Sequence, residues 1–478
     1  MLFNSTEFVV FFLLVTAFVY AVPNRARWPV LLIASCYFYM VFVPEYILIL
    51  LVLIVIDYVA GLLLVRTRGA LRRTLLVASL ISNIGMLAFF KYFHFAEHEW
   101  LRLSSWLGMS YHETAWNIVL PIGLSFHTFQ SMSYTIEVYR GRQPAERHFG
   151  IYALYVLFYP QMVAGPIERP QNLLHQFHDR VEFRAWRLIE GGQLIVWGLF
   201  KKMVIADNLA SIVDPAFNDP ATHRGLAMWL ATYAFAIQIY CDFSGYTDVA
   251  RGAARAMGYE LMRNFNVPYF ARSISEFWRR WHISLSTWFK DYLYIPLGGS
   301  RCSQLRNYFN ILVVFLVSGL WHGASWAFVL WGLLHGSYII FGDVTRRFRD
   351  ACWRLLPIQS DGWARSLIGI VVTFHLVLIA WVFFRAGTIH RVRNVFAAMR
   401  ARGATNLLPA SLDHFYRFGL IVALVLLAIA SLVQERAGLR ATYQRTPTIG
   451  RLVLFLGGIG FILLWGNFES RDFIYFQF

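Results

Sequence analysis

The sequence predicts an all-α, polytopic integral membrane protein. Hydrophobic residues fill 58% of the 478 positions and charged residues only 15%, while the aromatic share of 17% exceeds what a soluble core needs. Apolar runs of the roughly 20 residues that cross a bilayer as a helix recur along the whole chain. This criterion predicts about ten to twelve transmembrane helices, joined in places by re-entrant or interfacial helices.

The first apolar run, NSTEFVVFFLLVTAFVYAV at residues 4–22, predicts a mature membrane helix. A cleaved secretory signal carries a basic segment where this run has Glu7, and further apolar runs follow at once.

The net charge of +16 is spread over short connections between apolar runs, which is typical of cytoplasmic loops in membrane proteins. One basic domain for binding nucleic acid is not indicated. Arginines follow the first, third and fifth predicted spans, whereas the second connection, residues 43–46, has no Lys or Arg, so we expect the N-terminus outside the cytoplasm. The arginines in these connections are Arg25, Arg27, Arg66, Arg68, Arg72, Arg73, Arg140, Arg142 and Arg147.

The middle of the chain differs from its two ends. Between residues 160 and 340 the apolar runs are broken by Pro, Gly and charged residues. Irregular or charged backbone at membrane depth is tolerated only where it is packed in protein or lines a wet cavity. We therefore predict one membrane domain over residues 1–478, with a catalytic core at 151–345 between helical scaffolds at 1–150 and 346–478.

Residues 273–299 predict a single amphipathic helix that ends before Pro296. Helical spacing places an apolar stripe on one face and a polar row on the other. An interfacial helix at the lipid headgroups explains the stripe, but His282 on the polar row also suits a water-filled cavity, where the cation Arg279 would depress its pKa. The stripe comprises Ile274, Phe277, Trp278, Trp281, Leu285, Trp288 and Tyr292, and the polar row comprises Ser275, Arg279, His282, Ser286 and Lys290.

The stretch SGLWHGASW, residues 318–326, places His322 among small and apolar residues. On a helix Ser318 and Ser325 share its face and can fix the imidazole tautomer, as a general base requires. Gly319 and Gly323 would let another helix approach closely. A structural histidine bonded across helices is the alternative. His335 follows 13 residues later, about 220° round an ideal helix, which favours a packing role for it.

Other motifs offer fewer candidates. Asp242 and Asp248 in DFSGYTD predict a polar bridge between helices to an arginine, with a direct catalytic role as the alternative. A carboxylate that orients a histidine would combine the two. HFAEH, residues 94–98, matches an inverted zinc-protease signature but has no evident third ligand, and the four scattered cysteines form no CxxC pair, so no metal site is predicted. HxxxxD, GxSxG and P-loop motifs are absent from the sequence. A base acting on the substrate's own hydroxyl is therefore the simplest chemistry.

Several motifs together resemble the membrane-bound O-acyltransferase family, in particular its bacterial branch with the membrane subunit of alginate O-acetylation. They are QMVAGPIERP (161–170), QIYCDFSGYTDVARG (238–252), EFWRRWHISLSTWFKDYLYIPLGG (276–299), GLWHGASWAFVLWGLLHG (319–336) and the ending FIYFQF (473–478).

The resemblance implies a fold with a central tunnel in which His322 and His282 are catalytic. The donor would be an acyl thioester, most simply acetyl-CoA as cosubstrate, with no bound cofactor. The tunnel residues would be Asp242, Arg279, Arg280, Ser286, Ser318, Trp321 and Trp326, with the two arginines attracting the phosphates of the donor.

The resemblance also implies a bacterial inner-membrane location. The acceptor would be a polysaccharide, such as alginate, cellulose, another exopolysaccharide or peptidoglycan, reached directly or through a periplasmic acetyltransferase of the SGNH-hydrolase type. Acyl transfer from a carrier protein to a cell-wall polymer, a transporter or flippase of an activated group, and a scaffold that anchors a secretion complex are the alternatives.

Overall fold

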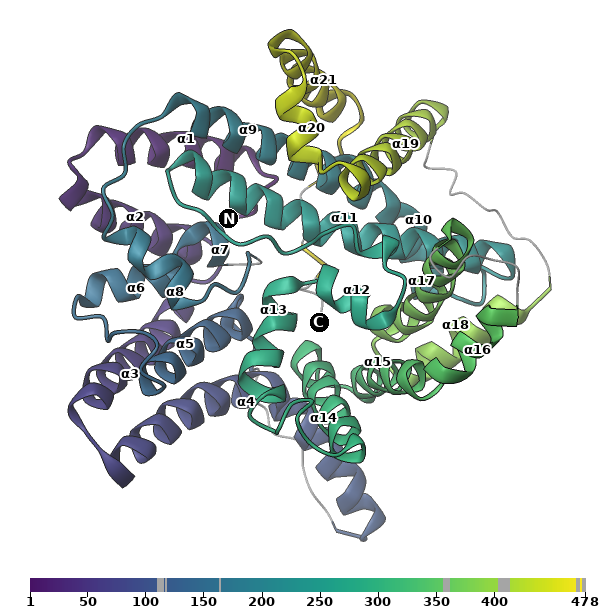
Figure 1. Cartoon of the computed structure of the whole chain (residues 1–478), viewed down its shortest axis with the longest axis horizontal. Coiled ribbons are helices and arrows are strands. Elements are labelled where there is room, and N and C mark those ends of the chain that lie inside the picture. The colour runs from purple at the N-terminus through teal and green to yellow at the C-terminus, as the bar shows by residue number, and fades with distance from the viewer. Residues whose placement is uncertain are drawn as a thin grey trace. The chain divides into compact units, whose positions relative to one another are not determined.

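The computed structural model describes residues 1–109, 116, 118–162, 165–355, 362–402, 413–469 and 473–474. Throughout these residues the regular structure is helical, and no strand occurs in them, which confirms the predicted all-α class (Figure 1). The chain forms two compact units, Met1–Ile195 with Val249–Met262 and Val196–Asp248 with Arg263–Phe478. The division into a core and two scaffolds stays a prediction.

The first unit is built around α3, which packs against α2, α4, α5 and α6. Asp57 of α3 is fully buried and accepts hydrogen bonds from Ser79 Oγ at 2.6 Å and Asn83 Nδ2 at 2.8 Å, both on α4. A buried carboxylate needs such donors, so these bonds fix α3 against α4. The helices of this unit are α1 (Thr6–Ala21), α2 (Asn24–Met40), α3 (Tyr46–Arg66), α4 (Gly69–Trp106), α5 (Leu124–Tyr139), α6 (Phe149–Leu157), α7 (Tyr159–Met162), α8 (Pro170–Leu173) and η1 (Leu174–Phe177).

Two helices, α9 (Ala185–Leu199) and α11 (Leu226–Ala256), have residues in both units. The remaining helices belong to the second unit. They are η2 (Phe200–Ala206), α10 (Asp207–Asn218), η3 (Pro268–Phe270), α12 (Ile274–Arg280), α13 (Ile283–Phe289), η4 (Lys290–Tyr294), α14 (Gln304–His322), α15 (Trp326–Val344), α16 (Arg346–Leu355), α17 (Trp363–Ala386), α18 (Ile389–Arg400), α19 (His414–Arg436), α20 (Leu439–Arg445) and α21 (Thr448–Trp465).

Seven helices of the described chain are long and apolar enough to cross a membrane: α3, α4, α11, α15, α17, α19 and α21. This is fewer than the ten to twelve expected, because other apolar runs fold into shorter helices. Residues 149–157 form a helix of nine residues, and the run 4–22 forms one of 16. In α21 only 6% of the apolar window is buried within the protein, so most of its surface is available to lipid. The protein is a multi-pass membrane protein.

The hairpin of α14 and α15 carries His322 and depends on close helix packing through glycines. The Cα atoms of Gly319 and Gly332 face each other, and a Cβ on Gly319 would overlap the carbonyl oxygen of Phe328, while one on Gly332 would overlap that of Phe315. The close approach predicted for Gly319 is therefore present, with α15 as the approaching helix. Gly323 faces the ring of Phe328 instead.

The buried carboxyl group of Glu168 connects the irregular segment at residues 165–170 of the first unit to Met262. Glu168 is fully buried and accepts a hydrogen bond from the backbone N–H of Met262. Burial raises the pKa of Glu168 from 4.5 to about 7, while that hydrogen bond and the nearby charges of Arg169 and Arg251 act in the opposite direction.

We expect Gly332→Ala to lower the free energy of unfolding by about 1–3 kcal/mol, because α14 must move away from α15 to make room for the added methyl. Thermal unfolding of the detergent-solubilised protein measures this. Gly342→Ala on the same helix is the matched control, since a Cβ there has nothing within 4 Å, and it should be neutral or stabilising. Equal melting temperatures for the two variants would contradict the packing described.

The stability of the protein should also fall as pH rises from about 4.5 to 7, because the unfolded chain releases the Glu168 proton at lower pH than the folded chain does. The group contributes up to about 3 kcal/mol below this range, and the contribution is lost above it. Melting temperatures measured across this pH range for the wild type and Glu168→Gln test whether Glu168 causes the loss of stability. The Gln variant should show a smaller decrease, and parallel curves would exclude Glu168 as the source.

Candidate active site

The helix predicted over residues 273–299 is wrong, because it is broken at Trp281 and His282. The α-helix α12 ends at Arg280, Trp281 is extended, and His282 takes a left-handed conformation with φ 43° and ψ 54° before α13 begins (Figure 1). In the described chain, Val267 is the other non-glycine residue with positive φ. Such a conformation costs about 1–3 kcal/mol and is typical of functional sites.

Side-chain and backbone groups of residues 264–266 hold this break in place. Asn264 O accepts from Ile283 N at 2.9 Å, and Asn264 Oδ1 accepts from Ser284 N at 3.1 Å and Ser284 Oγ at 3.0 Å. Asn266 N donates to Arg280 O at 2.9 Å. These bonds replace those that a continuous helix would have made, so the backbone at the break stays satisfied.

His282 is buried among aromatic rings, with 1% of its surface exposed. Its ring centroid lies 4.7 Å from that of Phe243 and 6.4 Å from that of Trp321. Burial lowers the pKa of His282 to about 3, so the imidazole is neutral at physiological pH. The sequence predicted that the charge of Arg279 would lower the pKa of His282. This was wrong, because burial lowers it and the side chain of Arg279 is exposed.

Two further predicted tunnel residues, Ser286 and Arg280, make contacts of their own within the protein. Ser286 is half-buried and donates to Trp281 O at 3.1 Å. Arg280 pairs with Glu276 at 2.7 Å and donates to both carboxylate oxygens of Glu435 on α19, at 2.5 and 3.0 Å. A donor phosphate would therefore have to displace a carboxylate from Arg280.

His322 is the last residue of α14, and its 5% exposed side chain lies in an aromatic enclosure. Its ring centroid is 4.9 Å from that of Trp321, 4.9 Å from that of Trp331 and 5.3 Å from that of Phe384. The ring of Trp321 therefore lies near both histidine rings. Trp326, predicted as a second wall, is 52% exposed, whereas Trp331 and Phe384 are buried beside His322.

The predicted shared face of Ser318, His322 and Ser325 is only partly present. Ser318 lies one turn before His322 on α14 and is buried. Ser325 lies beyond the end of that helix, as the N-cap residue of α15, and its hydroxyl donates to Gly387 O at 2.6 Å. The helix ends because the backbone at Gly323 is extended, with φ −163° and ψ 150°.

The same break changes the position of His335. It lies on α15, so the angle of 220° on one helix does not apply, and Trp331 contacts both histidine rings, with a centroid 5.0 Å from that of His335. Trp278 Nε1 donates to His335 Nδ1 at 3.3 Å. The packing role predicted for His335 therefore agrees with its contacts to Trp278 and Trp331, and not with the helical angle from which it was predicted.

Asp242 forms the predicted polar bridge, but to a lysine. Its carboxylate pairs with Lys202 at 2.6 Å, and Lys202 also pairs with Asp207 at 2.9 Å. The second oxygen of Asp242 accepts from the backbone N–H of Ile474 at 2.8 Å. The prediction of an arginine partner was wrong, and the same applies to Asp248, which pairs with Lys201 at 2.7 Å.

This charged cluster is linked to His282 through aromatic contacts. Phe473, next to Ile474, packs against Phe243 at 5.3 Å and Tyr246 at 4.9 Å, and Phe243 packs against His282. Residues 475–478 of the ending FIYFQF lie outside the described residues. Lys201 and Lys202 were not among the residues predicted from the sequence. The signal was present, because two lysines within the apolar run LIVWGLFKKMVIA are costly to bury and indicate partners or a functional site.

HFAEH gives no metal centre. His94 and His98 have half or more of their side chains exposed, and the nearest approach between His94 and Glu97 is 3.6 Å. Within the described ranges, no group of three His, Cys, Asp or Glu residues has the arrangement of a metal site.

Comparison with known proteins shows what family this arrangement belongs to. Residues 144–386, which include both histidines, match the membrane-bound O-acyltransferase family. The chain belongs to this family. The acyltransferase is 37% identical over 452 residues to a probable alginate O-acetylase of Pseudomonas aeruginosa, with 93% of this chain and 83% of the relative covered.

Two further relatives have different acceptors in their names. The acyltransferase is 35% identical to a peptidoglycan O-acetyltransferase of Helicobacter pylori, with 87% of this chain and 81% of the relative covered. It is 27% identical to a teichoic acid D-alanyltransferase of Bacillus subtilis, with 58% and 72% covered. The protein is therefore a membrane-bound O-acyltransferase enzyme.

We expect Asp242→Ala to destabilise the acyltransferase by about 3–5 kcal/mol, because it removes a partner of the buried Lys202 and the acceptor for Ile474 N. Asp242→Asn keeps an acceptor oxygen and should cost less. Melting temperature and protease cleavage near the C-terminus measure the two effects. Asp350→Asn, at a carboxylate that is 39% exposed and pairs with the 36% exposed Arg365, is the control, and a cost as large as that of Asp242→Ala would contradict a special role for Asp242.

Proposed function

We propose that this acyltransferase is an O-acetyltransferase of the bacterial inner membrane. It takes an acetyl group from a cytoplasmic thioester, acetyl-CoA, and transfers it toward the hydroxyl groups of an exported polysaccharide such as alginate. The names of the O-acetylase and O-acetyltransferase relatives support the acetyl group and the class of acceptor. The observation that carries the proposal is the placement of two buried imidazoles, His282 and His322, beside the same ring, that of Trp321.

His322 is the general base in this proposal. It lies at the end of a helix, next to the irregular turn of residues 323–325. It removes the hydroxyl proton as the oxygen attacks the thioester carbonyl, the C–S bond breaks, and the proton passes to the leaving thiolate. General-base catalysis contributes on the order of 10²- to 10⁴-fold to the rate.

His282 acts without a net charge. Because burial keeps its imidazole neutral, it can donate a hydrogen bond from one nitrogen and accept one at the other. We assign it to orienting the donor carbonyl or the acceptor hydroxyl. The left-handed backbone of His282 is held by the hydrogen bonds of Ile283 and Ser284 to Asn264. The imidazole is thereby positioned before the substrate binds, as an orienting group requires.

The acceptor is either the polysaccharide itself or a serine hydroxyl of a periplasmic acetyltransferase of the SGNH-hydrolase type that relays the acetyl group. One alternative is acyl transfer from a carrier protein to a cell-wall polymer, and the name of the teichoic acid D-alanyltransferase relative supports the acceptor in this alternative. A transporter of an activated group would break no thioester bond. Release of free CoA by the purified protein therefore separates the enzyme from the transporter, and comparing acetyl-CoA with an acetylated carrier protein identifies the donor.

We predict that His322→Ala lowers acetyl transfer by about 10²-fold or more, because no other group takes the hydroxyl proton. His282→Ala should cause a large but incomplete loss. Release of CoA and acetylation of polysaccharide in membranes measure both. His390→Ala, at an exposed residue of α18, is the matched control and should retain wild-type activity.

Both variants must be folded and inserted, which melting temperature and membrane fractionation establish. A folded His322→Ala protein with unchanged polysaccharide acetylation would remove His322 from the mechanism. Wild-type kinetics for His282→Ala would assign His282 to structure alone.

A further inference from the structure

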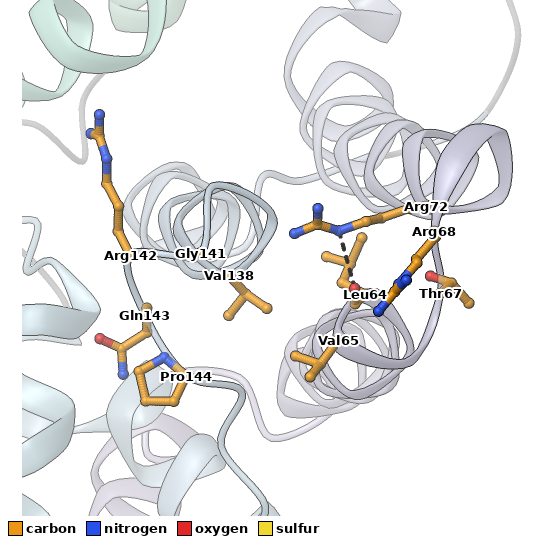
Figure 2. A pocket seen from close by; sticks show the side chains of 10 residues that line it. All are labelled: Leu64, Val65, Thr67, Arg68, Arg72, Val138, Gly141, Arg142, Gln143 and Pro144. Carbon is orange, nitrogen blue, oxygen red and sulfur yellow. Dashed lines mark hydrogen bonds between the residues drawn. The ribbon is translucent and has the colours of Figure 1, made fainter.

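A basic pocket lies in the first unit, and neither His282 nor His322 is among its lining residues. It has a volume of about 500 Å³ and is formed where α3 ends, α4 begins and α5 ends. Figure 2 shows that side chains from these three places line it, and that the guanidinium group of Arg72 points into the space between the helices. Arg68 and Arg142 also belong to the lining, although the guanidinium group of Arg142 points away from Arg72 in Figure 2, and none of the lining residues is acidic.

Arg72 is fixed by the backbone and keeps its charge. Its Nε donates to Leu64 O at 3.1 Å (Figure 2). Its Nη2 donates to Tyr139 O at 2.5 Å, and the guanidinium carbon lies 4.8 Å from the centroid of the Tyr139 ring. Carbonyl groups orient a guanidinium group without neutralising it. Glu137, close by on α5, pairs with Arg140 at 3.1 Å and accepts from Gln171 at 2.8 Å. The pocket therefore presents an oriented, positively charged group.

The rest of the lining is partly apolar, and an exposed apolar stripe on α3 ends close to it in the sequence. Leu64, Val65 and Val138 line the pocket, and Val65 is 64% exposed. Exposed apolar side chains at steps of four, three, four and four residues form a stripe along α3, one of the helices long enough to cross the membrane. The stripe ends within one turn of the pocket and consists of Leu48, Val52, Val55, Val59 and Leu63.

We propose that this pocket binds the phosphate group of an anionic phospholipid, with an acyl chain lying along the α3 stripe. Arginine is suited to phosphate because its planar group donates two parallel hydrogen bonds. Basic pockets at the ends of membrane helices are typical sites for anionic headgroups. A free phosphate has the same chemistry at the arginines, but it has no use for the apolar stripe, so the lipid is the favoured source.

The test measures retention of phosphatidylglycerol, against phosphatidylcholine, by the full-length protein after extraction from mixed vesicles. The variants are Arg72→Gln and the double variant Arg68→Gln/Arg142→Gln, whose two wild-type arginines are exposed. The matched control is Arg66→Gln/Arg73→Gln, which removes equal charge from neighbouring exposed positions that do not line the pocket. Each pocket arginine should contribute about fivefold to phosphatidylglycerol retention, whereas the control should change it little.

A second arm adds inorganic phosphate or CoA at constant ionic strength. If the lipid is the ligand, neither should displace phosphatidylglycerol beyond the effect of salt. Displacement by either compound, lost in the double variant, would identify a soluble phosphate ligand and overturn the lipid proposal. Equal losses in the pocket and control variants would show a general charge effect and also overturn it.

Discussion

A polar group in a membrane protein needs a partner within the protein, and this constraint decides the structure around His282. Where α12 stops, the freed N–H groups of Ile283 and Ser284 would be unsatisfied in an apolar setting, and Asn264 accepts from both. Because one asparagine satisfies both groups, the chain can hold a left-handed histidine at this position. The orientation of His282 toward Phe243 and Trp321 follows from that bend.

The buried charges obey the same constraint on a larger scale. Lys202 lies on the π-helical segment η2 and has Asp207 and Asp242 as partners, and Asp242 in turn holds the backbone of Ile474. A π-helical turn is frequent at functional sites, and here it places a lysine among carboxylates. As a result, residues near the C-terminus pack beside the aromatic contacts of a histidine that lies almost 200 positions earlier in the chain.

The aromatic enclosure gives the two histidines different environments. His282 is surrounded within a backbone bend, whereas His322 lies at the end of a helix that stops because Gly323 is extended. Packing of Trp331 against both His322 and His335 adds a second contact between α14 and α15, next to their contact at Gly319 and Gly332. Rings of this kind keep a site apolar while leaving the imidazole edges as its polar groups.

The sequence by itself determined the helical class, the multi-pass membrane character and the family, because apolar runs of sufficient length and a set of specific motifs are local properties of the chain. It also identified His282, His322 and Asp242 as polar residues where burial is costly. It could not place the helix breaks at Trp281 and Gly323, since the spacing of apolar residues is compatible with continuous helices on both sides.

Tertiary structure decided which residues surround each histidine. Asn264, Lys202, Phe384 and Phe473 are distant in sequence from the residues they hold, and no local pattern specifies such pairs. Arg280 binds Glu435, and Ser325 donates to Gly387 O. These partners differ from the donor phosphate and the His322 imidazole that the sequence predicted for them. Local sequence therefore fixed which groups need a partner, and the packing of distant segments fixed which partner each one has.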